Sequence, residues 1–371
     1  MTRQIYDAII VGGGAAGIGA AVALKDADIE NYLVLERHQV GASFSAWPEE
    51  TRFLTPSFPT NSIGMLDLNS VSIGTSPAFS LQAEHPTGKE FALYLRQVAL
   101  ILELPISENT TVLRISRIAD EFVIDTEEHT LRAKHLIWAA GEFQYPLMSG
   151  FTGSELCLHT SMIERFADLQ ADDFIIIGGF ESGVDAAYHL ASRGLNVRLF
   201  DRVNPWSTTT SDPSTALSTY SQERMSEPFF KNHVTLYPDT AIGSVIKTSN
   251  AYEITTEDDS RFTTSQPPIL ASGFVGSHRL ILDMFEERPD GYPLLNENDE
   301  STLVPGLFMC GPAVRHDDHV FCFIFKFRMR FAVVAKAIAT SLGVPAAGLE
   351  EYRDWGMYLD DLSCCGEECI C

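Results

Sequence analysis

The chain alternates short apolar runs with longer amphipathic stretches, a pattern that predicts strands connected by helices. The first unit begins with the apolar run 5–11 and continues through the glycine-rich segment 12–17 and a helical stretch from 16 to about 25. It ends with a second apolar run, 32–35, which Glu36 follows. Continuous apolar runs of this length are typical of strands that are buried on both faces of a parallel sheet. The pattern therefore predicts a strand–helix–strand unit.

The segment between the first strand and the helix has the spacing Gly-x-Gly-x-x-Gly. In such a turn the first glycine allows a tight bend, the second lets backbone amides approach a pyrophosphate, and the third lets helix and strand pack closely. Glu36 is placed to accept hydrogen bonds from ribose hydroxyls. An unrelated glycine-rich turn is the alternative, which the register of the whole unit disfavours. The expected cofactor contacts are Gly12, Gly14, Ala15, Ala16, Gly17, Glu36 and Arg37.

A second unit repeats this arrangement later in the chain. The apolar run 174–177 precedes the glycine-containing segment 178–183 and a helix predicted from 184 to about 192. Another apolar run, 197–200, ends at Asp201. Two such units imply two bound dinucleotides, or one dinucleotide and a vestigial site.

Two positions of the second unit bear on its ligand. Phe180 replaces the middle glycine, so we expect the turn to open differently and the phosphates to lie further from the backbone. Asp201 takes the place of Glu36 and favours an unphosphorylated ribose, whereas the neighbouring Arg202 can receive a 2′-phosphate. The choice between NADH and NADPH stays open. The expected nucleotide contacts are Gly178, Glu181, Ser182, Gly183, Asp201 and Arg202.

Three further segments complete a resemblance that covers roughly residues 5–340. They read Leu-Ile-Trp-Ala-Ala-Gly at 136–141, Ile-Leu-Ala-Ser-Gly at 269–273 and Pro-Gly-Leu-Phe-Met-Cys-Gly at 305–311. Together with the two glycine turns, they resemble the two-dinucleotide-binding-domain flavoproteins. That family includes thioredoxin reductases, flavin-containing monooxygenases and bacillithiol disulfide reductase-like enzymes.

The resemblance implies an α/β fold in which a Rossmann-like FAD domain is interrupted by an inserted, second Rossmann-like NAD(P)H domain. We expect a discontinuous FAD-binding domain at 1–150 and 285–345 and an NAD(P)H-binding domain at 151–284. Residues 346–371 form an acidic, cysteine-rich tail. The implied cofactors are FAD and either NADPH or NADH.

By resemblance, further cofactor contacts come from the loop after the first unit and from the strand ends near 140 and 272. Others come from the turn at 311–312 and from the helix expected to begin near 321. Trp47 can equally be a packing residue, because large aromatics contribute to cores everywhere. The helix N-terminus is expected to stabilise negative charge on the flavin, although most phenylalanines of that helix are expected in the core. Pro312 stands where many relatives have Asp, so a backbone amide or Asp317 takes the role of that acid. The implied contacts are Ser43, Phe44, Trp47, Ala140, Gly141, Ser272, Gly273, Gly311, Pro312, Phe323 and Ile324.

The sequence departs from the disulfide reductases of this family at their internal cysteine pairs. It has neither the Cys-x4-Cys pair of the lipoamide type nor the Cys-x2-Cys pair of thioredoxin reductases. The segment 40–47 is closer to flavin monooxygenases and to bacillithiol reductase-like proteins. Phe151, Gly153 and His159 echo the monooxygenase linker Phe-x-Gly-x3-His, but the histidine comes two residues late.

The last eight residues contain Cys364, Cys365, Cys369 and Cys371. Residues 348–371 carry seven acids and one arginine, and neighbouring acids raise the pKa of a thiol. Three interpretations remain: a mobile dithiol arm that relays electrons, with Cys364 and Cys365 as the catalytic pair; a four-thiolate metal site; and an ordinary flexible tail.

The overall charge limits the partners. The formal net charge of −24 repels phosphate backbones and anionic lipids, so nucleic acid and membrane surfaces are excluded. An odd count of seven cysteines without a signal peptide indicates a reducing, cytoplasmic compartment. We expect a small-molecule or thiol/disulfide substrate and, as one option, a homodimer. The polar cluster 316–319 is expected to cap a helix and to be solvated, so no metal site is predicted.

These observations predict an FAD-dependent NAD(P)H oxidoreductase that passes a hydride from nicotinamide to flavin and on to a disulfide or thiol-derived substrate. A flavin monooxygenase that uses O2 is the alternative. A non-catalytic redox or metal-binding sensor is a second alternative, which the departures at Phe180 and Pro312 would suit.

Overall fold

Strand β1 (Tyr6–Val11) is formed by the first apolar run and lies inside a seven-stranded sheet. Its neighbours β2 (Tyr32–Leu35) and β6 (Thr130–Trp138) run parallel to it. Ala8, Ile9 and Ile10 are fully buried, as expected for a strand that is covered on both faces. The other strands of this sheet are β3 (Ile106–Ser107), β4 (Val112–Ile118), β5 (Glu121–Thr126) and β17 (Leu307–Met309).

Strand β6 takes part in two kinds of pairing. Its first half pairs antiparallel with β5, which pairs antiparallel with β4. Its second half pairs parallel with β1 on one side and with β17 on the other. Val11 and Met309 are both in register with Trp138, so the chain leaves β1, β6 and β17 at the same edge of the sheet.

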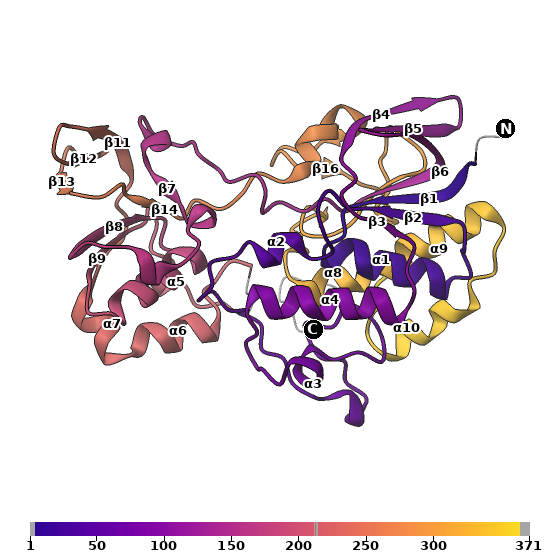
Figure 1. Ribbon diagram of the computed structural model, residues 1–371, viewed down its shortest axis with the longest axis horizontal. Coiled ribbons are helices and arrows are strands. Elements are labelled where there is room, and N and C mark those ends of the chain that lie inside the picture. Colours follow the sequence, from indigo (N-terminus) through magenta and orange to yellow (C-terminus); the bar gives the residue numbers. More distant parts are fainter. Residues whose placement is uncertain (1–3, 211, 213, 364–371) are drawn as a thin grey trace. The chain divides into compact units, whose positions relative to one another are not determined.

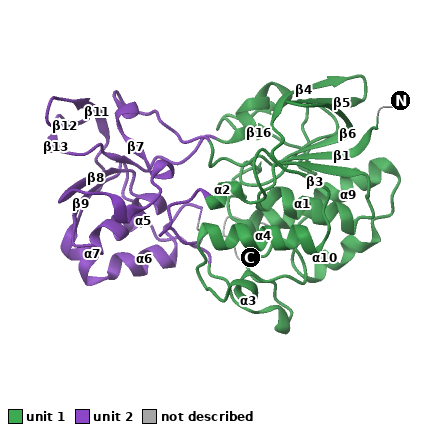
Figure 2. Ribbon diagram, viewed as in Figure 1, with its two compact units in different colours: residues 1–45, 56–144, 276–367 green, residues 46–55, 145–275, 368–371 purple. Residues whose placement is uncertain are grey.

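The computed structural model describes residues 4–210, 212 and 214–363, which divide into two compact units (Figures 1 and 2). Among the described residues, unit 1 contains 4–45, 56–144 and 276–363 and includes the sheet around β1. Unit 2 contains the rest, which is 46–55 and the part that starts at 145 and ends at 275. The predicted inserted domain, 151–284, corresponds to 145–275 in the structure, and unit 2 also contains 46–55. Residues 346–363, predicted as part of a separate tail, belong to unit 1, where Leu349, Tyr352 and Met357 are buried.

Helix α1 (Ala15–Asp26) covers the sheet of unit 1, and its residues from Ala15 to Leu24 are all buried. Helix α9 (Phe331–Leu342) packs against α1, where Gly19 makes room for the ring of Phe331. A Cβ atom at Gly19 would lie 1.9 Å from that ring. Helix α4 (Gly88–Ile101) lies on the same side of the sheet (Figure 1). The shorter helices of unit 1 are α2 (Ala42–Ser45), α3 (Pro77–Leu81), α8 (Ile324–Phe327) and α10 (Glu351–Asp354).

Unit 2 contains a second parallel sheet, with the strand order β10-β9-β8-β14-β7. An apolar cluster around Phe174, Val184 and Leu190 connects this sheet to helix α5. The strands are β7 (Leu158–His159), β8 (Asp173–Ile177), β9 (Asn196–Phe200), β10 (Val234–Tyr237) and β14 (Ile269–Leu270). The helices are α5 (Glu181–Ala191), α6 (Thr219–Ser226) and α7 (Pro228–His233).

A three-stranded antiparallel sheet belongs to the same unit. Val245 and Ile254 from this sheet form a second apolar cluster with Ile175 and Phe200 from the parallel sheet. Its strands are β11 (Ile242–Lys247), β12 (Tyr252–Thr256) and β13 (Arg261–Thr264). Two short hairpins in unit 1 complete the strands: β15 (Glu286–Glu287) with β16 (Pro293–Leu294), and β18 (Arg315–His316) with β19 (His319–Val320).

The predicted fold class is confirmed: an α/β chain in which a second Rossmann-like unit is inserted into the first. Within the part of the chain that the structure describes, no helix has both the length and the apolar character needed to cross a membrane.

The segment 46–55 belongs to unit 2 because its polar groups are bonded there. The carboxylate of Glu50 accepts hydrogen bonds from the amides of Phe166 and Ala167, at 3.0 and 2.9 Å. The hydroxyl of Thr51 donates to the carboxylate of Asp185 on α5, at 2.7 Å. These long-range contacts leave no trace in the periodicity of the sequence.

Candidate functional site

The first glycine turn follows β1 at the edge where the strands of unit 1 end. Gly12 has a φ of +113°, and a Cβ atom there would lie 2.4 Å from the carbonyl oxygen of Ala139. A Cβ atom at Gly17 would lie 1.8 Å from the carbonyl oxygen of Gly12. A Cβ atom at Gly14, in contrast, would meet nothing within 4 Å. The turn therefore needs glycine at two positions for its own packing and leaves open space at the third.

Helix α1 begins at this open space. Gly14 is its N-cap residue and provides no side-chain cap, and the first turn of the helix contains no acid. The exposed amides of a helix N-terminus attract anions, so this position suits a phosphate.

The carboxylate of Glu36 faces the same turn. Its Oε2 accepts a hydrogen bond from the amide of Gly13 at 2.7 Å, and its Oε1 accepts one from the amide of His38 at 2.8 Å. A carboxylate has about four acceptor positions, so acceptor capacity remains for ribose hydroxyls.

The second glycine turn, after β8, has the same geometry. Gly178 has a φ of +102°, and Cβ atoms at Gly178 and Gly183 would lie 2.3 Å from the oxygen of Ala271 and 1.8 Å from that of Gly178. Asp201 takes the place of Glu36: its Oδ2 accepts from the amide of Gly179 at 2.6 Å, and its Oδ1 from the amide of Val203 at 2.9 Å.

The expectation that Phe180 opens this turn differently is wrong. Phe180 has φ −84° and ψ −159°, which match the −83° and −168° of Gly14. These are extended angles that any residue adopts without strain, so the backbone does not need glycine here. The substitution acts through the side chain: Phe180 packs against the apolar core of unit 2 and also lines a cavity in that unit.

A cavity of about 610 Å³ lies within unit 2 at the carboxyl ends of β8, β9 and β14. Open parallel sheets bind their ligands at this edge. Gly183 supports the turn from behind and does not line the cavity. The predicted residues in its wall are Gly178, Glu181, Ser182, Asp201, Arg202, Ser272 and Gly273.

Other residues of the wall escaped sequence analysis. Thr240 and Ala241 follow β10, the neighbour of β9, and Glu257 follows β12. Glu257 directly follows β12 and Ala241 directly precedes β11, so positions next to strand ends are the signal that could have found them. Ser149 and Gly150 belong to no strand or helix, so their sequence carries no comparable signal.

The predicted flavin contacts of unit 1 lie near the first turn at several points. The amide of Gly41 donates to the carbonyl oxygen of Gly13 at 3.0 Å, so α2, with Ser43 and Phe44, begins beside this turn. A Cβ atom at Gly311 would lie 3.0 Å from the Cβ atom of Ala16. The backbone of Gly311 therefore approaches the start of α1, and Pro312 follows it there.

Two other expected contacts have a different setting. Trp47 belongs to unit 2, where its ring lies 5.0 Å from that of Phe53. Phe323 precedes α8 and Ile324 begins it, but this helix has only four residues. Asp317 lies exposed in the turn between β18 and β19, so it does not fit the role of the acid that Pro312 replaces.

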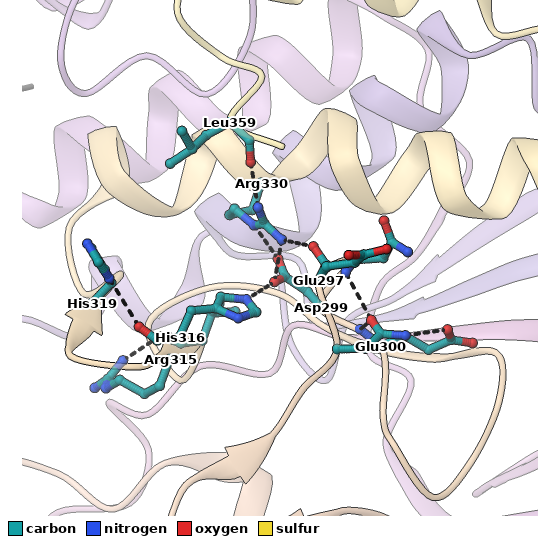
Figure 3. A network of polar contacts seen from close by, with 11 residues as sticks. Glu297, Asp299, Glu300, Arg315, His316, His319, Arg330 and Leu359 are labelled. Carbon is teal, nitrogen blue, oxygen red and sulfur yellow. Dashed lines mark hydrogen bonds and ion pairs between the residues drawn. The ribbon is translucent and has the colours of Figure 1, made fainter. Parts of the chain in front are cut away.

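Within the polar cluster 316–319, Asp317 and Asp318 are exposed, as expected for a solvated turn, whereas His316 belongs to a buried network (Figure 3). The Nε2 atom of His316 lies 2.5 Å from Oδ1 of Asp299, which is completely buried. Arg330 donates to both oxygens of Asp299, at 3.0 and 2.9 Å, and to the carbonyl oxygen of Leu359. This network fixes the polypeptide around β17. Among the described residues, no three His, Cys, Asp or Glu side chains are grouped so that they could hold a metal ion.

The thiols of Cys157 and Cys310 are buried and suit packing better than redox chemistry. Burial, with a smaller contribution from Glu155, raises the pKa of Cys157 to about 12. Burial also raises the pKa of Cys310. A thiol needs to ionise before it attacks a disulfide. Cys364 and Cys365, the predicted catalytic pair, lie outside the described residues.

Comparisons with known proteins agree with this geometry. A family model described as pyridine nucleotide-disulphide oxidoreductase matches residues 9–311. The uncharacterized oxidoreductase CzcO of Bacillus subtilis is 26% identical over 195 residues, which are 50% of this chain and 52% of the relative. Bacilliredoxin reductase Bdr of the same organism is 27% identical over 201 residues, or 54% of this chain and 58% of the relative. The chain thus spans about half the length of these curated relatives.

Two solved structures resemble the whole fold. Bacillithiol disulfide reductase Bdr (YpdA) from Staphylococcus aureus has a TM-score of 0.74 at 19% identity, with coverage of 91% of this chain and 99% of that structure. A flavin-containing monooxygenase from Stenotrophomonas maltophilia has a TM-score of 0.71 at 15% identity, with coverage of 92% and 100%. At these identities the likeness concerns the fold.

Proposed function

Because the chain belongs to the pyridine nucleotide-disulphide oxidoreductase family, we propose that it is an FAD-dependent NAD(P)H oxidoreductase that reduces a disulfide or another thiol-derived substrate. The observation that carries the proposal is the pair of equivalent dinucleotide turns, one in each unit. In both turns, the acid after the second strand accepts hydrogen bonds from two backbone amides at equivalent positions.

The turn of unit 1 fits the ribose and diphosphate of FAD. The amides at the start of α1 face the open space at Gly14, and Glu36 has acceptor capacity for ribose hydroxyls. Gly311 and Pro312 border the start of α1 and belong to the wall that would hold the rest of the cofactor. When bound, FAD supplies two-electron redox chemistry, and the protein supplies its position and its electrostatic surroundings.

The cavity of unit 2 fits the nicotinamide nucleotide. Its volume of about 610 Å³ lies in the range of small-molecule sites. We assign the amides at the start of α5 to the diphosphate and Asp201 to the adenosine ribose. Ser272 and Gly273, at the end of β14, border the same cavity.

A disulfide is the acceptor we favour, because relatives by sequence and by fold bear the names bacilliredoxin reductase and bacillithiol disulfide reductase. Reduction of a disulfide takes two electrons and two protons and yields two thiols; the hydride brings both electrons and one proton, and solvent supplies the other. Cys157 and Cys310 are buried, Cys322 is partly buried, and the other four cysteines lie at the end of the sequence. We assign the exchanging thiols to Cys364 and Cys365 or to the substrate itself.

Monooxygenation is the second candidate. The linker residues Phe151 and Gly153 favour it, as does the fold of a flavin-containing monooxygenase, whereas His159 comes two residues late for the monooxygenase linker. His159 is buried, and its Nε2 donates to the carbonyl oxygen of Gly273 at 3.0 Å, so the linker supports the wall of the cavity in unit 2. The sensor alternative rested on the departures at Phe180 and Pro312. The first no longer supports it, because the backbone at Phe180 is that of an ordinary dinucleotide turn.

One experiment separates the two enzyme candidates. The purified holoprotein is reduced by NADH or NADPH without oxygen, and the flavin absorbance is followed after addition of either a disulfide or O2. Rapid reoxidation by the disulfide, lost in the double variant Cys364→Ser/Cys365→Ser, supports reduction through the tail; retention in that variant shows that Cys364 and Cys365 are not required. A persistent oxygen adduct of the flavin, with no response to disulfides, would overturn the reductase proposal.

A further inference from the structure

The carboxylate of Asp201 is immobilised at the end of β9. Backbone amides of Gly179 and Val203 bind one oxygen each, at 2.6 and 2.9 Å. The acceptor capacity that remains can take the 2′- and 3′-hydroxyls of a ribose. Because both oxygens are anchored to the main chain, the carboxylate cannot turn away from a larger group on the 2′-position.

The wall of the cavity around Asp201 is acidic. Its charged side chains among the described residues are Glu181, Asp201 and Glu257 against Arg202. Glu181, in the first turn of α5, adds to this negative charge, and hydrogen bonds from the hydroxyls of Ser218 and Ser221 keep its carboxylate beside the turn. A 2′-phosphate would bring about −1.5 to −2 further charges into these surroundings. A 2′-hydroxyl brings none and donates a hydrogen bond to the carboxylate.

Arg202 provides the opposing charge. It lines the cavity, but its side chain is exposed to solvent. Water and salt screen an exposed charge, whereas the carboxylate of Asp201 is half-buried and fixed. The electrostatic interactions at the 2′-position of the ribose therefore favour a hydroxyl over a phosphate.

We propose that this protein selects NADH over NADPH and that Asp201 sets the choice. The inference rests on the proposed function for the use of a nicotinamide nucleotide, but not on the identity of the final acceptor.

The test measures binding directly and requires no turnover. The FAD-loaded full chain is titrated in a calorimeter with ADP-ribose and with 2′-phospho-ADP-ribose, which differ only at the 2′-position. We expect the wild type to bind ADP-ribose about tenfold or more tightly. Asp201→Ser should shrink that ratio by weakening ADP-ribose and strengthening the phosphorylated probe. Asp201→Asn, which keeps the shape and removes the charge, should shrink it as well.

Asp239→Asn is the matched control. Asp239 is an exposed acid of the same unit that does not line the cavity, and Asn tolerates its left-handed φ of +50°. The control should keep the wild-type ratio.

Equal binding of the two probes by the wild type, or tighter binding of the phosphorylated one, would overturn the proposal. In that case loss of the phosphorylated probe in Arg202→Ala would assign the 2′-position to Arg202. If neither probe bound, the nucleotide site itself would be refuted. A clear preference for ADP-ribose without any disulfide reduction would instead support the choice of NADH and contradict the proposed acceptor.

Discussion

Glu36 and Asp201 are held in the same way, although they belong to different units of the chain. Each carboxylate accepts a hydrogen bond from the residue after the first glycine of its turn, Gly13 at 2.7 Å or Gly179 at 2.6 Å. Each also accepts one from the residue two positions after the acid itself, at 2.8 and 2.9 Å. This repetition points each acid at the opening of its own turn, which is where the ribose of a dinucleotide lies.

Gly14 and Gly17 of the first turn should respond differently to replacement by alanine. In Gly17→Ala the new Cβ atom would lie 1.8 Å from a backbone oxygen, so the helix and the turn must separate. We expect a loss of roughly 1–3 kcal/mol or more in the free energy of unfolding, together with loss of FAD. Urea denaturation and the absorbance of bound flavin measure both effects.

Gly14→Ala serves as the matched comparison. Its Cβ atom would meet no protein atom within 4 Å, so stability should stay close to that of the wild type. The methyl group points into the space assigned to the diphosphate, and FAD affinity should fall. Equal stability of the two variants would contradict the packing account, and unchanged FAD affinity in Gly14→Ala would contradict the diphosphate assignment.

Phe180→Ala should weaken unit 2 without reshaping its turn. The ring packs against the apolar core beside α5, and its partial burial contributes roughly 1–3 kcal/mol to the free energy of unfolding. Because the backbone angles already match those of Gly14, binding of ADP-ribose should change less than it does in Asp201→Ser. A larger loss of binding in Phe180→Ala would show that the ring contacts the nucleotide directly.

The buried acid Asp185 should make the stability of unit 2 depend on pH below about 4. Burial by itself raises the pKa of Asp185, but the hydrogen bond and charge of His189 and the charge of Arg224 outweigh it and lower the pKa to about 2. A group whose pKa is lowered on folding stabilises the fold above its unfolded pKa, and this stabilisation is lost as the pH falls through the folded value. The shift corresponds to about 2 kcal/mol.

Urea denaturation of the wild type and of Asp185→Asn between pH 5 and pH 2 tests this point. The difference in unfolding free energy between them should shrink as the pH falls. Asp239→Asn, at an exposed position, should show a much smaller difference from the wild type. A difference for Asp185→Asn that stays constant with pH would refute the coupling.

The two buried thiols should take no part in electron transfer. At pH 8, iodoacetamide should leave Cys157 and Cys310 unmodified in the folded protein and should label both in urea, as peptide mapping can show. Cys157→Ala/Cys310→Ala should keep disulfide-dependent reoxidation of the flavin. Loss of that reaction in a folded variant with normal FAD content would place one of these thiols in the pathway.

The local features of this fold could be predicted from the sequence because they depend on neighbouring residues. The expected helices at 16–25 and 184–192 correspond to α1 and α5, and the apolar runs correspond to buried strands. The acids Glu36 and Asp201 were recognisable because an acid directly follows the second strand in each unit.

The features that could not be predicted depend on distant parts of the chain. The attachment of 46–55 to unit 2 requires Thr51 to meet Asp185, which lies more than a hundred positions away. The network of Asp299 and Arg330 likewise joins a turn before β17 to the start of α9. At Phe180 the residue type suggested a distorted turn, but the extended backbone there accepts any side chain.

The central claim, that each acid marks a separate dinucleotide site, is tested most directly by measuring FAD content and ADP-ribose binding in Glu36→Gln and Asp201→Asn. Glu36→Gln should lower FAD content and leave ADP-ribose binding to the remaining protein unchanged, whereas Asp201→Asn should keep FAD content and weaken ADP-ribose binding. Loss of both ligands in each folded variant, or of neither, would contradict the account.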